Sequence, residues 1–137
     1  MVKQILNIEV YPLKNSDYVA YAGSMVHWSP TPIFSAVPFT AGTASYENQT
    51  QINSGISTYN ITVSANILAT DKNRASLEKL THRALIAKVT FNDKSIAIFG
   101  SKHIPARLTF TEKVDKSGYY QVKISCKTPL TPASIIG

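Results

Sequence analysis

The residues able to do nucleophilic, acid–base or metal chemistry are few in this sequence and widely separated. Three histidines, His27, His82 and His103, fall in three different expected elements, and no two have the spacing of metal ligands. The one cysteine, Cys126, alternates with apolar residues along a strand, which favours a small core residue over a nucleophile. Glycine-rich phosphate loops and the Gly-x-Ser-x-Gly elbow are missing from the sequence. We therefore expect no enzyme activity, catalytic residue, metal, cofactor or small-molecule substrate.

The elements that would position any site are mostly β-strands, and the clearest is residues 57–68. Apolar and polar residues alternate there without error, and the apolar set is Tyr59, Ile61, Val63, Ala65 and Ile67. This pattern predicts a long antiparallel strand with one dry and one wet face. Residues 43–51 are its expected partner, through a turn at Asn53-Ser54-Gly55. Because residues 47–55 are almost wholly polar, the hairpin is expected to protrude from the domain.

Further strands are expected on both sides of this hairpin. The sequence predicts strands at 2–11, with Val2, Leu6, Ile8 and Val10 inward, and at 18–27, followed by two hairpins, 85–91 with 96–100 and 106–114 with 119–127. One short α-helix is expected at about residues 71–83, capped by Thr70 or Asp71. The predicted fold is mainly β: a single-domain antiparallel β-sandwich or barrel with one helix and a long protruding hairpin.

Length and composition agree with one globular domain. The chain has 137 residues, of which 44% are hydrophobic and 16% charged. A single cysteine cannot form an intramolecular disulfide. No apolar run approaches the roughly 18 residues of a membrane span, and Asn7 and Glu9 interrupt any signal-peptide pattern. We expect a soluble domain at 1–127, no membrane partner, and an extended C-terminal arm at 128–137.

Charge is unevenly distributed along the chain, which carries +6 overall. Residues 1–71 have a net charge of −2 and residues 72–137 a net charge of +8. Such halves can present opposite surfaces to other copies of the chain, or one basic face to DNA or to an acidic protein. Alternatively, lysines on strand edges only keep a β-rich protein from aggregating.

Eight residues are candidates for interaction. The proline-rich segment 28–38 holds apolar side chains that either pack on their own domain or dock on a neighbour, and the hairpin tip is polar. The candidates are Trp28, Ile33 and Phe34 in that segment, Gln51 and Asn53 at the tip, and the cations Lys102, Arg107 and Lys123.

An OB-like barrel that binds single-stranded nucleic acid is the alternative interpretation. Such a barrel places aromatic and basic residues on one face. The aromatic candidates are Phe91, Phe99, Phe110 and Tyr119, beside Lys88, Lys102, Arg107 and Lys123. Strand alternation puts Phe91 and Phe110 on core faces and leaves Tyr119 on a wet face.

The C-terminal half also carries a family resemblance. A strand ending at Gly100, a link containing Pro105, and a polar hairpin closed by Pro129 resemble small structural proteins encoded by phages and prophages of Bacteroides-type gut bacteria. The helix and the opening strand Ile5–Val10 are similar as well. The resemblance implies a virion component of the neck or tail (a connector, tail-completion or tail-tube-like protein).

That resemblance also implies how such a protein would work. It would form ring-like homo-oligomers, dock on other virion proteins close to DNA, and assemble in the cytoplasm of the bacterial host. Contacts between unlike surfaces of identical subunits close such rings. The family brings no catalytic residue.

Overall fold

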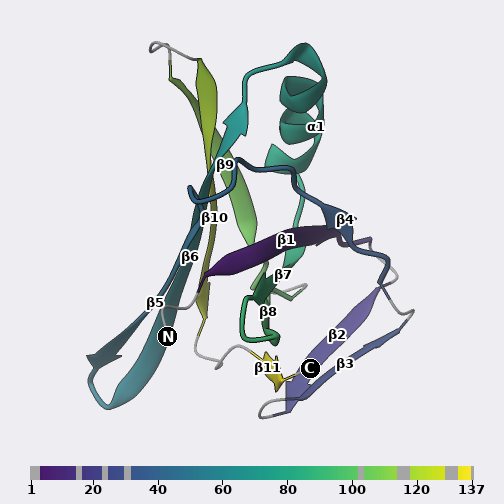
Figure 1. The fold of residues 1–137 in the computed structure, drawn as a ribbon. Coiled ribbons are helices and arrows are strands. Elements are labelled where there is room, and N and C mark those ends of the chain that lie inside the picture. Colours follow the sequence, from purple (N-terminus) through teal and green to yellow (C-terminus); the bar gives the residue numbers. More distant parts are fainter. Residues whose placement is uncertain are drawn as a thin grey trace.

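The chain forms a β-sandwich with one helix (Figure 1). The computed structural model describes residues 4–14, 17–22, 25–29, 32–101, 104–113, 118–128 and 133–136, with only the backbone described at 18–22, 25–26, 53 and 133–136. Two antiparallel sheets, of five and four strands, face each other, and a two-stranded sheet lies beside them. The predicted mainly β class is confirmed. Of the two predicted architectures, sandwich and barrel, the two separate sheets match the sandwich.

The elements follow the expected order. The helix is α1 (Asp71–Thr81). The strands are β1 (Ile5–Pro12), β2 (Tyr18–Ala22), β3 (Met25–Ser29), β4 (Ser35–Ala36), β5 (Ser45–Asn53), β6 (Ile56–Leu68), β7 (Leu85–Phe91), β8 (Ser95–Phe99), β9 (Arg107–Lys113), β10 (Tyr119–Thr128) and β11 (Ala133–Ile136). The sheet orders are β11-β8-β7-β1-β4, β5-β6-β10-β9 and β2-β3.

The main core lies between the two larger sheets. Alternate residues of β6 point into it, and Ile61, Val63, Ala65 and Ile67 are buried as predicted. In register, Val63 pairs with Ile124, and Ile124 pairs with Leu108, so one apolar row crosses three strands. The polar residues between them lie on the opposite, outer face of the four-stranded sheet.

The β5–β6 hairpin has the predicted turn. Ser54 and Gly55 both have positive φ, of 52° and 79°, as a two-residue type I′ turn requires. The described pairing of β10 with β6 ends where Thr128 lies opposite Tyr59, and beyond that point the described part of the ribbon is the two strands β5 and β6. Figure 1 shows this ribbon projecting at the lower left, past the body of the sandwich.

The five-stranded sheet has an apolar layer on both faces. Val89 and Ala87 point into the main core, whereas Leu13, Ile86 and Ile98 form a second buried cluster on the other face. Five half-buried side chains pack against this second cluster: Tyr11, Trp28, Phe34, Ala84 and Ile96. We call the cluster, together with these five side chains, the satellite core. A small outer layer therefore holds β3 and the segment before β4 against the sheet.

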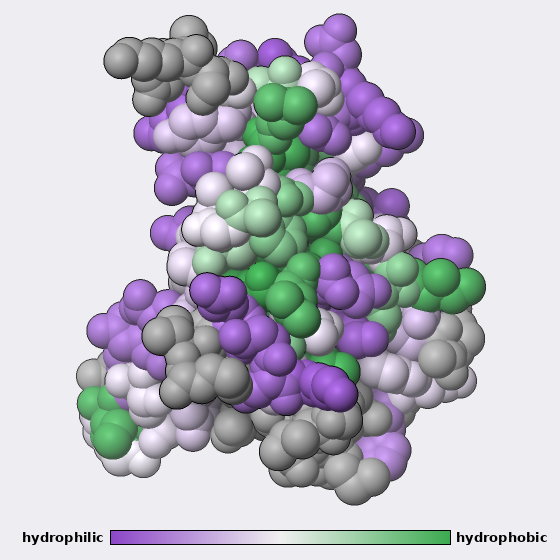
Figure 2. Space-filling view, in the orientation of Figure 1, coloured by the Kyte–Doolittle hydropathy of each residue, from purple (hydrophilic) through white to green (hydrophobic). Residues whose placement is uncertain are grey.

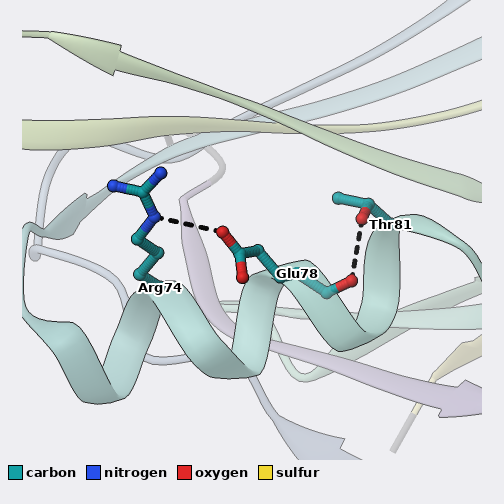
Figure 3. A network of polar contacts seen from close by, with 3 residues as sticks. All are labelled: Arg74, Glu78 and Thr81. Atoms are coloured by element: carbon teal, nitrogen blue, oxygen red, sulfur yellow. Dashed lines mark hydrogen bonds and ion pairs between the residues drawn. The ribbon is translucent and has the colours of Figure 1, made fainter.

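Helix α1 is capped as the sequence predicts. The Thr70 side chain accepts a hydrogen bond from the Asn73 amide at 3.1 Å, and Leu77 is the helix's buried residue. Arg74 donates to Glu78 at 3.1 Å, and the Thr81 hydroxyl donates to the Glu78 carbonyl in the last turn (Figure 3). The helix ends at Thr81, two residues before the expected 83.

Three expectations about strands are corrected. The segment expected as one strand at 18–27 is divided between two antiparallel strands, β2 and β3. The register of β1 shifts between Ile5 and Asn7, so Leu6 is a bulge residue and is 54% exposed instead of buried. In the C-terminal segment, Ala133–Ile136 pairs with β8 as an edge strand of this chain's own sheet.

Candidate functional site

The chemically reactive residues form no common site in the described part of the chain. His27 and His82 are exposed and lie on different elements, and His103 is outside the described residues. No group of three metal-ligating side chains occurs among the described residues. Cys126 is only 4% exposed, with its Sγ 3.7 Å from the Ile104 carbonyl, and burial raises the pKa of its thiol to about 11. The thiol is therefore neutral and shielded near pH 7.

A more distinctive feature is the outer edge of β5. This strand is nine residues long, has an uninterrupted register with β6, and contains no proline or cationic residue. The other outer edges of the two larger sheets differ from it: β4 has two residues between Pro32 and Pro38, β11 has four residues, and β9 carries the cations Arg107 and Lys113. Long unguarded edges are the ones on which further strands pair.

The turn geometry shows which β5 groups face outward. Across a two-residue turn, the flanking residues Asn53 and Ile56 exchange hydrogen bonds, and bonded and non-bonded pairs then alternate along the ribbon. Gln51, Gln49 and Glu47 therefore bond to β6. The outward N–H and C=O groups belong to the residues between them, Tyr46, Asn48, Thr50 and Ile52. They give β5 a ladder that is open to a further strand.

The end of the hairpin carries two exposed isoleucines, which the sequence interpretation missed. Ile52 is 70% and Ile56 64% exposed, on opposite faces of the ribbon. Figure 2 shows a hydrophobic spot at the lower left, where the ribbon of Figure 1 ends. We call residues 50–58 the tip. Two of the candidates for interaction, Gln51 and Asn53, belong to the tip. Gln51 is half-buried, and for Asn53 the structure describes the backbone but not the side chain.

Arg107 and Lys123 come together on the outer face of the four-stranded sheet. Arg107 pairs with Ser125 and Lys123 with Thr109, so the two cations are diagonal neighbours on adjacent strands. Both line a shallow polar depression of about 640 Å³, together with Lys127 and with Gln49, Asn60, Thr62 and Ser125. We call it the basic depression. The third candidate cation, Lys102, lies outside the described residues.

The described residues of the proline-rich segment, 28–29 and 32–38, lie against their own domain. Trp28 and Phe34 are half-buried in the satellite core, with ring centroids 6.0 Å apart in an edge-on arrangement. The Lys88 ammonium lies 5.4 Å from the Phe34 ring. Ile33 is 85% exposed and is the one of the three apolar candidates that remains fully accessible.

Aromatic residues near the basic depression offer little stacking surface. Phe91 and Phe99 are buried in the main core, and Phe110 packs edge-on against Tyr120 at 5.5 Å. Tyr119 is half-buried, on the same face of β10 as Lys123. Of the four aromatic candidates, Tyr119 alone shares the face of the basic depression.

A second hollow, absent from the sequence interpretation, lies between α1 and the β1–β4 region. This helix groove has a volume of about 350 Å³, and its lining is Val10, Pro12, Ser35, Ala36, Val37, Pro38, Ile67, Asn73, Ser76, Leu77, Lys79, Leu80 and Arg83. Most of these side chains are apolar, with Lys79 and Arg83 as the cations. The one signal in the sequence was the apolar stripe of Leu77 and Leu80 on the helix.

Known proteins give no guide to these surfaces. No helix in the described part of the chain is long and apolar enough to cross a membrane. Comparison with models of protein families, with curated proteins and with solved structures found no match.

Proposed function

We propose that this chain is a structural protein of a phage virion, in the neck or tail, that acts by ring-like self-association and by docking on neighbouring virion proteins. The observation that carries the proposal is the open edge of β5, nine residues long and without a proline or a cationic residue on the strand. A partner strand would satisfy its outward amide and carbonyl groups. In this proposal the protein assembles in the cytoplasm of the bacterial host and resides in the virion.

Ring formation needs two unlike surfaces on each copy. The four-stranded sheet has β5 at one edge and β9 at the opposite edge, so β5 of one copy can pair with β9 of the next. On the outer face, β5 carries Glu47, whereas β9 carries Arg107 and Lys113. Opposite charges across the new strand pair favour this contact over the pairing of two β5 strands.

A proline at position 48 tests the proposal. Asn48→Pro removes an N–H that points away from β6, so the β5–β6 pairing is kept and the open edge is blocked. Asn48→Ser is the matched control, because it shortens the same side chain and keeps the N–H. The mass of each protein is measured by light scattering, and particles are examined by electron microscopy.

We expect rings from the unsubstituted chain and from Asn48→Ser, and monomers from Asn48→Pro with an unchanged circular dichroism spectrum. A chain that stays monomeric at a concentration of about 100 μM overturns the proposal, since self-association with a Kd of about 1 μM would be nearly complete at that concentration. Rings from Asn48→Pro would remove the β5 edge from the assembly.

The basic depression supports a second candidate, the binding of single-stranded nucleic acid. Arg107, Lys123 and Lys127 lie within one depression with hydroxyl and amide groups around them. In this alternative, affinity for a labelled oligonucleotide falls by at least about tenfold between 50 and 200 mM salt, and Lys123→Gln reduces that slope by about one. Binding that does not depend on salt would exclude it.

A further inference from the structure

Figure 1 shows the β5–β6 hairpin, which ends in the tip, at the lower left and α1, one wall of the helix groove, at the upper right. We propose that the tip of one copy docks in the helix groove of a second copy, with Ile52 and Ile56 contacting the two walls of the groove. One wall is α1, and the other is the β1–β4 region. This inference rests on the proposed self-association and names the contact surfaces of one interface.

The two surfaces match in polarity. Residues 48–58 carry no charged side chain, and Ile52 and Ile56 are more than half exposed. The groove offers the exposed Ala36 and Pro38 from one wall and the half-buried Leu80 from the other, above the buried Val37 and Leu77. A volume of about 350 Å³ is within the range of pockets that hold a ligand group. Burying two isoleucines there removes apolar surface of both copies from water.

The shapes also correspond. Ile52 and Ile56 lie on opposite faces of a two-stranded ribbon, because Ile52 pairs with Ser57 and Asn53 pairs with Ile56. A ribbon that enters a two-walled groove end-on therefore presents one isoleucine to each wall. Exposed apolar residues on a single face would instead fit a flat surface.

The ribbon of a second copy would bring hydrogen-bond acceptors to the two cations of the groove. Lys79 and Arg83 line the groove, and the Arg83 guanidinium donates a long bond of 3.5 Å to the Leu13 carbonyl. The open edge of β5 carries outward carbonyl groups at Thr50 and Ile52. Cationic donors beside apolar walls can therefore hydrogen-bond the backbone of an inserted ribbon.

A second copy is the occupant because the chain's own tip is at the other end of the sandwich. Each copy has one tip and one groove, so the contact is heterologous and can repeat from copy to copy. It would add to the β5–β9 pairing and would hold the ribbon, which as an isolated two-stranded hairpin is marginally stable.

Engineered cysteines test the contact. A tagged Ile52→Cys chain is mixed with Ala36→Cys or with Ser76→Cys, which place a thiol on one wall or the other, and the mixture is oxidised. Ala75→Cys is the matched control, because Ala75 is exposed on α1 next to Ser76 but does not line the groove. The native Cys126 is buried and does not compete. The same mixtures are made with Ile56→Cys.

We expect Ile52→Cys to form a disulfide with one of the two wall variants, Ala36→Cys or Ser76→Cys, which gives a linked pair of one tagged and one untagged chain. The mixture with Ala75→Cys should give at least tenfold less of this product. Ile56→Cys should select the opposite wall from Ile52→Cys. Equal product with all three partners, or none, overturns the inference. If light scattering in the same samples still shows assemblies, the proposed self-association stands and this contact alone is wrong; samples that stay monomeric overturn both.

Discussion

Gly100 lies so close to the backbone of Leu85 that a Cβ on Gly100 would overlap the Leu85 carbonyl oxygen. Its φ of 104° is also one that residues with a side chain rarely adopt. The contact occurs where β8 ends and where Leu85 and Ala106 form an isolated bridge with bonds of 3.0 and 3.1 Å. The glycine thus allows the chain to leave β8 and pass directly over the start of β7.

Gly100→Ala should therefore destabilise the fold by on the order of 3 kcal/mol, since it adds backbone strain and a steric overlap. Thermal unfolding should show a loss of about 10 °C in Tm. Gly42→Ala is the control, because Gly42 has a φ of 80° but no atom within 4 Å of an added Cβ. Equal losses in Tm would show that the overlap contributes nothing.

Neighbouring residues of β6 should respond oppositely to a carboxylate. Ile61 is fully buried, so Ile61→Asp places an unpaired acid in the core and should cost several kcal/mol. Asn60 faces outward opposite Lys127, so Asn60→Asp should change the free energy of unfolding by less than about 0.5 kcal/mol. Urea denaturation followed by circular dichroism measures both, and similar midpoints would contradict the assigned faces.

The thiol of Cys126 should make stability depend on alkaline pH. Its pKa of about 11 in the folded chain exceeds the ordinary 9.0, so the folded state keeps the proton longer than the unfolded state. The stabilisation is complete below pH 9 and is lost as the pH rises toward 11. Between these values the wild type should lose on the order of 2 kcal/mol more than Cys126→Ala. Parallel pH curves for the two proteins would refute this.

Charge reversal at Arg107 separates the two candidate functions. Arg107 is exposed, so Arg107→Glu should leave Tm within about 2 °C while it weakens assembly through the β9 edge. The control is Lys94→Glu, an exposed turn residue on the other sheet. Oligomer mass and oligonucleotide affinity are measured for both variants. Unchanged rings with lost oligonucleotide binding would favour the nucleic-acid candidate.

Removal of residues 129–137 should destabilise the fold. The segment Ala133–Ile136 pairs with β8, whose residue Ile98 belongs to the satellite core, so deletion exposes a sheet edge. We expect a fall in Tm of several degrees, by calorimetry. An unchanged Tm would instead agree with the extended arm that the sequence predicts at 128–137.

Regular alternation made much of the fold predictable. The faces of β6 and β10, the type I′ turn at Ser54 and Gly55, and the Thr70 cap depend on residues close in sequence. Leu6 was wrong because a bulge, which no local pattern marks, shifts the register after Ile5. The division of 18–27 between β2 and β3 was missed as well.

The candidate surfaces were less predictable, because they depend on which elements meet. Arg107 and Lys123 were found, since each lies on the wet face of a strand, but their adjacency needed the β9–β10 register. The helix groove brings together β1, the β4 region, β6 and α1, and no spacing in the sequence relates them. Ile52 and Ile56 were missed because each stands alone among polar residues.

The position of Trp28 affects how the unfolding of this protein can be observed. It is the one tryptophan in the chain, and it packs against Phe34 in the satellite core, outside the main core between the two larger sheets. Tryptophan fluorescence will therefore report on the outer layer, whereas far-ultraviolet circular dichroism will report on the sandwich. A fluorescence change at lower denaturant concentration than the dichroism change would mean that the outer layer detaches first, and the protein would carry its own optical probe of that step.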